Sequence, residues 1–137
     1  MDGRIMPTDE QFRRSFERCE IPNDAFHHRD HLRLAWIYIL ESGPETAAIR
    51  VGQSIRRYAE HNGVGRRYHE TLSRVWVRIL GLAIAETPEA ASFEDLLAAR
   101  PHLLDKTLPL KHYSPAHLWS DAACEAWLEP DVRAFPG

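Results

Sequence analysis

Cysteine and long apolar runs are what this sequence has least of. Cys19 and Cys124 are the only cysteines among 137 residues, and they lie far apart without the spacing of metal ligands. We therefore expect reduced thiols in the core rather than a disulfide or a cysteine metal site. The longest unbroken apolar run, Leu34 to Leu40, has seven residues, which is too short to cross a bilayer.

A secretory signal and an excess of one charge are also missing. Residues 1–10 include acidic side chains and no apolar stretch of the signal-peptide kind, so we expect a cytoplasmic protein. The chain carries 17 Lys and Arg against 20 Asp and Glu, a net charge of -3 at pH 7, with no block of like charge. This balance argues against nucleic acid or a membrane surface as the partner.

Alternating strand patterns longer than a few residues are absent, and helical periodicity is broken by glycine and proline. These features predict an all-α fold, a compact bundle of about five to six helices. Hydrophobic residues make up 44% and charged residues 27% of the chain, which is typical of a globular protein and excludes disorder. The length corresponds to about one domain. We expect a single helical domain over residues 1–137, with an extended tail from about residue 129.

The predicted helices begin at capping residues and end at glycine or proline. They cover about residues 8–20, 27–42, 45–62, 67–86, a short segment from 92 and finally 115–128. The almost wholly apolar stretch from Leu32 to Leu40 makes the second helix the central one. The segment 105–113 is predicted to be a loop.

Histidine is the residue present in unusual number, at 8 of 137, and His27, His28 and His31 fall within five positions. If His27 and His31 are both helical, their Cβ atoms lie about 5 to 6 Å apart on one face, a spacing that allows two imidazoles to bind one ion. We expect His28 to face solvent. The clustering is the first indication of a functional site.

A third ligand follows from the expected topology. Helices joined by short loops pack antiparallel, so the helices near 27–42 and 67–86 should be parallel and begin at the same end of the bundle. His69 would then join His27 and His31 in a three-histidine site for a divalent metal, zinc or iron, with an open position for substrate. Asp30 or Glu70 could instead supply a carboxylate ligand in an iron site of two histidines and one carboxylate.

The remaining site residues are assigned to the same end of the bundle. Glu70 is predicted to transfer a proton, and Arg33 to bind and orient a small anionic molecule. The loop before residue 115 should return to this end, where His112 and Tyr113 would act in acid–base chemistry or contact the substrate. The leading hypothesis is therefore a metal-dependent enzyme acting on a small anion.

Two alternatives remain open from the sequence. Helix N-termini carry partial positive charge that disfavours a dication and favours an anion, so the chain could be a non-catalytic module that binds an anionic effector without metal. It could also be an interaction protein, with the histidines in the core and apolar helix faces forming a homodimer.

Three segments carry a resemblance to known sequences: F-H-H-R-D-H-L-R from residue 26, Y-H-E-T from residue 68, and Y-S-P from residue 113. The chain resembles, over about residues 26–130, a group of small uncharacterised bacterial proteins with F-x-H-x-x-H, Y-H-E-T and Y-S-P segments. The resemblance implies that these segments belong to one site, and it implies no particular reaction.

Overall fold

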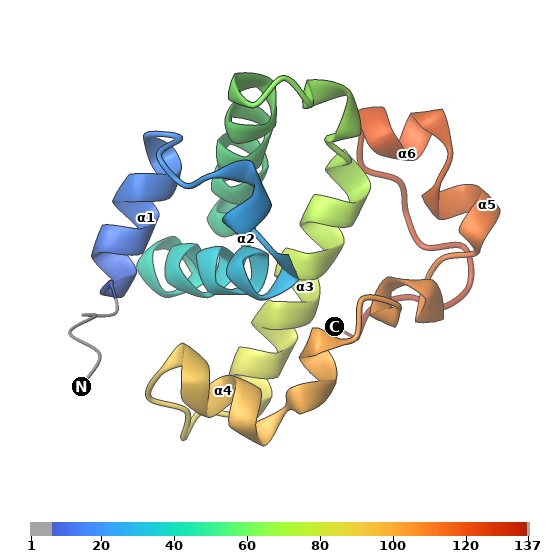
Figure 1. Cartoon of the computed structure of the whole chain (residues 1–137). Helices are drawn as coiled ribbons and strands as arrows, with labels where there is room; N and C mark the ends of the chain where they lie inside the picture. Colours follow the sequence, from blue (N-terminus) through green and yellow to red (C-terminus); the bar gives the residue numbers. More distant parts are fainter. Residues whose placement is uncertain (1–6, 137) are drawn as a thin grey trace.

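The structure is a computed structural model that describes residues 7–136, apart from the side chain of Arg67. Its regular elements in this range are α-helices and short 3-10 turns (Figure 1). The α-helices are α1 (Asp9–Glu17), α2 (His28–His61), α3 (Glu70–Glu86), α4 (Phe93–Ala99), α5 (Pro115–Leu118) and α6 (Asp121–Glu125). The 3-10 turns are η1 (Asn23–Ala25), η2 (Gly65–Arg67), η3 (Pro101–Leu104) and η4 (Leu108–Lys111). Residues 7–136 contain no strand, which confirms the all-α prediction. None of the helices in this range is long and apolar enough to cross a membrane.

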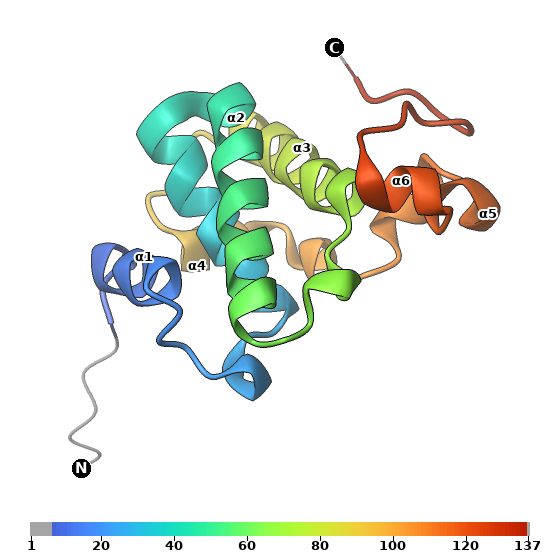
Figure 2. The same ribbon diagram turned by 90° about the horizontal axis from the view of Figure 1, so that it is seen from above.

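The predicted helices near 27–42 and 45–62 form one element, α2, bent at Gly43. Gly43 has φ +80° and ψ 163°, a backbone conformation that is almost exclusive to glycine. Pro44 follows it and cannot donate a backbone hydrogen bond, so the helix turns a corner there. The two halves run in different directions, as Figures 1 and 2 show.

This bend makes the expected parallel arrangement wrong. The second half of α2 lies roughly antiparallel to α3, whereas the first half crosses α3 at a steep angle (Figure 1). The start of α2 therefore meets the middle of α3: the ring of His28 lies 4.4 Å from that of Trp76, about two turns into α3. An antiparallel helix pair needs a loop long enough to reverse the chain direction. Gly43 and Pro44 only bend the helix, so its two halves do not pack antiparallel.

The prediction that the first half of α2 is central is confirmed. Leu32 and every residue from Leu34 to Ile39 are buried, so this half is covered on nearly all sides. It packs on α1, α3 and α4. Helix α1 is capped at its start by Thr8, whose hydroxyl accepts from the Gln11 backbone N–H at 3.1 Å. The core therefore fixes the position of the histidines at the start of α2.

The C-terminal part departs from the single helix predicted over 115–128. The Ser120 hydroxyl accepts from the backbone N–H of Ala123 at 3.2 Å and starts a second short helix, α6. The predicted loop at 105–113 contains the turn η4. The segment after α6, where an extended tail was predicted, contains no helix up to residue 136 and changes direction along its length (Figure 2). At its start the hydroxyl of buried Thr71 donates to the Ala126 carbonyl at 2.7 Å.

Candidate functional site

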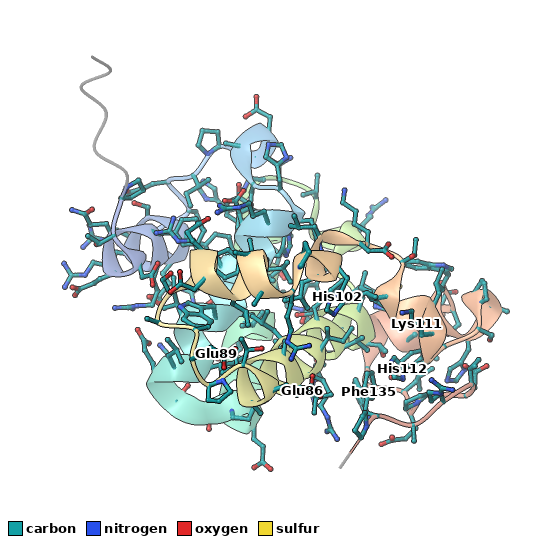
Figure 3. The ribbon with its side chains drawn as sticks, turned by 90° about the horizontal axis from the view of Figure 1, so that it is seen from below. Glu86, Glu89, His102, Lys111, His112 and Phe135 are labelled. Atoms are coloured by element: carbon teal, nitrogen blue, oxygen red, sulfur yellow. The ribbon has the colours of Figure 1, made fainter. Side chains whose placement is uncertain are left out.

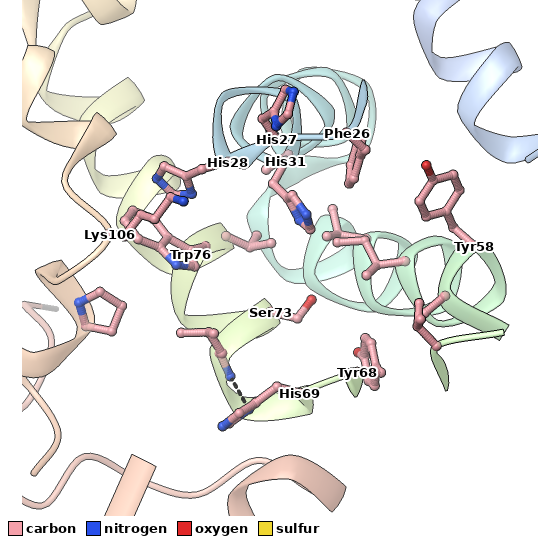
Figure 4. Close-up of a pocket in the computed structure, with 18 of the residues that line it drawn as sticks. Phe26, His27, His28, His31, Tyr58, Tyr68, His69, Ser73, Trp76 and Lys106 are labelled. Atoms are coloured by element: carbon pink, nitrogen blue, oxygen red, sulfur yellow. Dashed lines mark hydrogen bonds between the residues drawn. The ribbon is translucent and has the colours of Figure 1, made fainter. Parts of the chain in front are cut away.

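A cavity of about 570 Å³ lies between the start of α2, its second half, α3, the segment 106–110 and the end of α5 (Figure 4). Most of its wall is apolar, including the rings of Phe26, Tyr58 and Trp76. Its basic lining residues are His27, His28, His31, His69 and Lys106. Among the described residues that line it there is no Asp or Glu. The structure thus brings the predicted histidines to one cavity, although by a different route from the one expected.

His31 points into this cavity in the direction of Ser73 (Figure 4). Its ring lies 4.2 Å from that of Phe26 and forms no hydrogen bond with any described residue. Burial, followed by the charges of His28 and Lys106, lowers the pKa of His31 to about 4. His31 is therefore neutral at pH 7, with one nitrogen that donates and one that accepts.

His28 does not face solvent as predicted. It is half-buried, with its ring against the edge of Trp76, and its Nε2–H donates to the Leu103 carbonyl at 3.1 Å. Burial lowers its pKa, the hydrogen bond to Leu103 opposes this, and Lys106 lowers it further. The bond fixes the tautomer and leaves Nδ1 without a partner among the described residues.

His27 lies before the helix rather than on its face. Its backbone is extended, with φ -107° and ψ 176°. Its backbone N–H donates to the Asp30 carboxylate at 2.9 Å. Its ring is exposed and turned away from that of His31 (Figure 4). The expectation that His27 and His31 share a helical face is wrong, because the helical pair is His28 and His31. Asp30 acts here as the partner of the helix cap.

His69 has both ring nitrogens engaged. It caps α3, with Nδ1 accepting from the backbone N–H of Leu72 at 3.0 Å. Its Nε2–H donates to the Leu118 carbonyl at 2.6 Å, and Trp119 packs edge-on against the ring. A metal ion would have to displace one of these two bonds. His69 therefore joins α5 to the start of α3, although it also lines the cavity.

Glu70 lies beside the cavity without lining it. The Tyr68 hydroxyl donates to Glu70 at 2.5 Å, and Arg74 lies 3.4 Å from the other carboxylate oxygen. Burial raises the pKa of Tyr68, and the Glu70 carboxylate raises it further. A Cβ atom on Gly52 would lie 2.8 Å from the Tyr68 hydroxyl. The absence of a side chain at Gly52 is what lets this pair approach α2.

Arg33 is directed to α1 and away from the cavity. Its guanidinium lies 4.6 Å from the centre of the Phe12 ring and 3.0 Å from the Asp9 carboxylate, and it donates to the Pro7 carbonyl at 2.8 Å. These contacts hold the first helix on the second. The structure therefore places the predicted substrate-orienting residue outside the site.

His112 and Tyr113 do not line the cavity. His112 lies beside Phe135 of the C-terminal tail (Figure 3). His112 donates through Nδ1 to the Arg133 carbonyl at 2.8 Å and stacks on Phe135 at 4.1 Å. Tyr113 is fully buried and donates to the Leu128 carbonyl at 2.6 Å. Burial, followed by Glu129 and Asp131, raises the pKa of Tyr113 to about 12. Both residues anchor the tail.

Two lining residues were missed by the sequence reasoning. Lys106 lies in the segment predicted as a loop, where no pattern singled it out, but that segment does return to the histidine end. Ser73 lies four residues after His69 and three before Trp76, so helical periodicity could have placed it on the same face. Its hydroxyl is buried in the cavity wall.

Within residues 7–136, no group of three or more His, Cys, Asp or Glu side chains is arranged to hold a metal ion. The metal site therefore stays a prediction. Comparison with known proteins gives no family model, no curated protein and no solved structure that matches the chain.

Proposed function

We propose that this chain binds a small organic acid, a molecule with an apolar body and one negatively charged group, in the cavity between α2 and α3. The observation that carries the proposal is the composition of the cavity wall: aromatic and aliphatic side chains surround His28, His31 and Lys106, without a carboxylate from the described residues. An apolar cavity with a few convergent polar groups is the usual form of a small-molecule site, and about 300 to 1,000 Å³ is its usual size.

Lys106 supplies the positive charge for this acid. It is exposed and forms no ion pair with a described carboxylate, and it lies close enough to His28 and His31 to lower the pKa of both. The N-terminus of α2 adds partial positive charge beside the same histidines. An anion at this edge would interact favourably with all of these groups, whereas a bare cation would be repelled.

The proposal is tested by measuring the affinity for 3-phenylpropionate and its uncharged amide by calorimetry. We expect the acid to bind more tightly, and Lys106→Gln to weaken the acid about fivefold with little effect on the amide, since a partly exposed ion pair contributes about 1 kcal/mol. Lys111→Gln is the matched control because Lys111 is exposed and does not line this cavity. Equal affinities for acid and amide would contradict the proposal.

A second candidate keeps the metal-dependent enzyme predicted from the sequence. His28 Nδ1 and both nitrogens of His31 are unbonded among the described residues, and His28 donates its other N–H to a carbonyl, as metal-binding histidines commonly do. These two residues, rather than His27 and His69, would hold zinc or iron, which would polarise a bound anion as a Lewis acid. Elemental analysis of untagged protein tests it: metal lost in His31→Ala would support it, and metal-free native protein would contradict it.

The cytoplasmic location and the relation to the bacterial group stay predictions. A homodimer also stays a prediction.

A further inference from the structure

The Ser73 hydroxyl is a polar part of the cavity wall that the organic acid as proposed does not explain. Its oxygen is buried and forms no hydrogen bond with a described residue. It lies near the Tyr68 hydroxyl and opposes the rise in the pKa of that group, but the two do not reach hydrogen-bond geometry. The Tyr68 hydroxyl donates its proton to Glu70. A buried polar group without a partner is uncommon in native proteins and calls for an explanation.

The surroundings of Ser73 indicate what its partner would be. In Figure 4 its oxygen points into the cavity, in the direction of His31. The neutral His31 ring can accept a hydrogen bond, and the Ser73 hydroxyl can donate or accept one. A hydroxyl group is suited to lie between them, because it donates and accepts at once. A second carboxylate is not, since it only accepts, and the neutral His31 ring and the Ser73 hydroxyl supply no positive charge to balance it.

The shape of the ligand follows from the aromatic rings that line the cavity. Trp76 lies beside Lys106, and Phe26 and Tyr58 lie on the opposite side, beyond His31 and Ser73 (Figure 4). Aromatic rings pack against other rings in offset or edge-to-face arrangements, which favour a flat aromatic body.

We infer that the organic acid proposed above, on which this inference rests, is a hydroxylated aromatic acid: its carboxylate lies at Lys106 and its ring hydroxyl bonds to Ser73 and His31. Ser73 is then the residue that distinguishes a hydroxylated ligand from an unsubstituted one. Sites that hydrogen-bond a ligand hydroxyl discriminate against the analogue that lacks it, because their buried polar groups are left unpaired.

The test compares 3-phenylpropionate with its three ring-hydroxylated isomers by calorimetry, in the native chain and in Ser73→Ala. In the native chain, one isomer should bind about tenfold more tightly than the unsubstituted acid. In Ser73→Ala this gain should fall to about twofold, while the unsubstituted acid binds as before. The ring-methylated counterpart of the best isomer controls for size and should show no gain in the native chain.

The results separate this inference from the function on which it rests. If the acids bind but no isomer gains, or the gain survives in Ser73→Ala, the inference is overturned and the organic-acid site stands. If none of the acids binds, both fail.

Urea unfolding without ligand gives an independent reading. Because Ser73 has no partner, Ser73→Ala should leave the free energy of unfolding unchanged or raise it. Ser54→Ala is the matched control: Ser54 is also buried, its hydroxyl lies 2.9 Å from that of Tyr38, and its removal should lower stability. An equal loss in Ser73→Ala would mean that an internal group or a buried water already satisfies the hydroxyl, which would overturn the inference.

Discussion

At the residue scale, neighbours decide what each histidine does. His31 and His69 line the same cavity, but His69 has bonds at both nitrogens and His31 has none among the described residues. His69 is therefore a structural group, and His31 is available to a ligand. His28 and His112 each bond to a carbonyl through one ring nitrogen, but His28 bonds to Leu103 and lines the cavity, whereas His112 bonds to Arg133 in the tail.

Burial of His31 makes stability depend on pH. Its pKa is lowered from 6.5 to about 4, so the unfolded chain takes up a proton before the folded one as the pH falls. Stability should be fully present above about pH 6.5 and fall by up to about 3 kcal/mol toward pH 4. Urea unfolding across this range measures it. His31→Leu should reduce the slope of the unfolding free energy against pH, whereas His61→Gln, at an exposed position, should leave that slope unchanged. Equal slopes for the native chain and His31→Leu would contradict this prediction.

Replacing His69 tests its structural role. His69→Ala should lower the free energy of unfolding by about 2 to 3 kcal/mol, because α3 loses its cap and the Leu118 carbonyl loses its donor. His69→Asn can still cap the helix and should lose less. Chemical denaturation of the three proteins gives the order, and an unaffected His69→Ala would show that neither bond contributes.

At the element scale, the bend of α2 and its close approach to α3 shape the site. Gly43 sets the bend, and Gly52 lets the Tyr68–Glu70 pair lie against the second half of α2. Because the first half crosses α3, the histidines at its start lie over the middle of that helix. The cavity is the space left at this crossing.

Gly52→Ala should disturb this approach. The added methyl would lie 2.8 Å from the Tyr68 hydroxyl, and relieving such overpacking costs about 1 to 3 kcal/mol. Removing the hydroxyl in Tyr68→Phe should recover part of this loss, so the double variant should be more stable than the sum of the single effects implies. If the effects of Gly52→Ala and Tyr68→Phe on the unfolding free energy simply add, the added methyl group does not clash with the Tyr68 hydroxyl.

At the scale of the whole molecule, the cavity and the tail are separate. The tail is fixed by the backbone N–H groups of Val132 and Arg133, which donate to the His112 carbonyl at 2.9 and 3.3 Å, and by Phe135 stacked on His112. None of these residues lines the main cavity. The C-terminal segment thus contacts α3 at a different place from the cavity.

Deleting residues 132–137 should therefore lower the melting temperature and leave ligand affinity within about twofold, since distant sites with no shared partner act independently. Thermal unfolding and calorimetry with 3-phenylpropionate measure the two effects. A larger loss of affinity with an intact fold would mean that the tail and the cavity are coupled.

The sequence by itself determined the local features. Periodicity and caps determined the all-α class, the central position of the Leu34–Ile39 segment and the start of α1 at Thr8, because these depend on spacing within a few residues. Only the tertiary structure decided the site. The chain direction after Gly43, the bonds of His69 to Leu118 and of His28 to Leu103, and the arrival of Lys106 all join residues distant in sequence. Such contacts depend on the angle at which α2 crosses α3, which the packing of the core sets and no local pattern encodes.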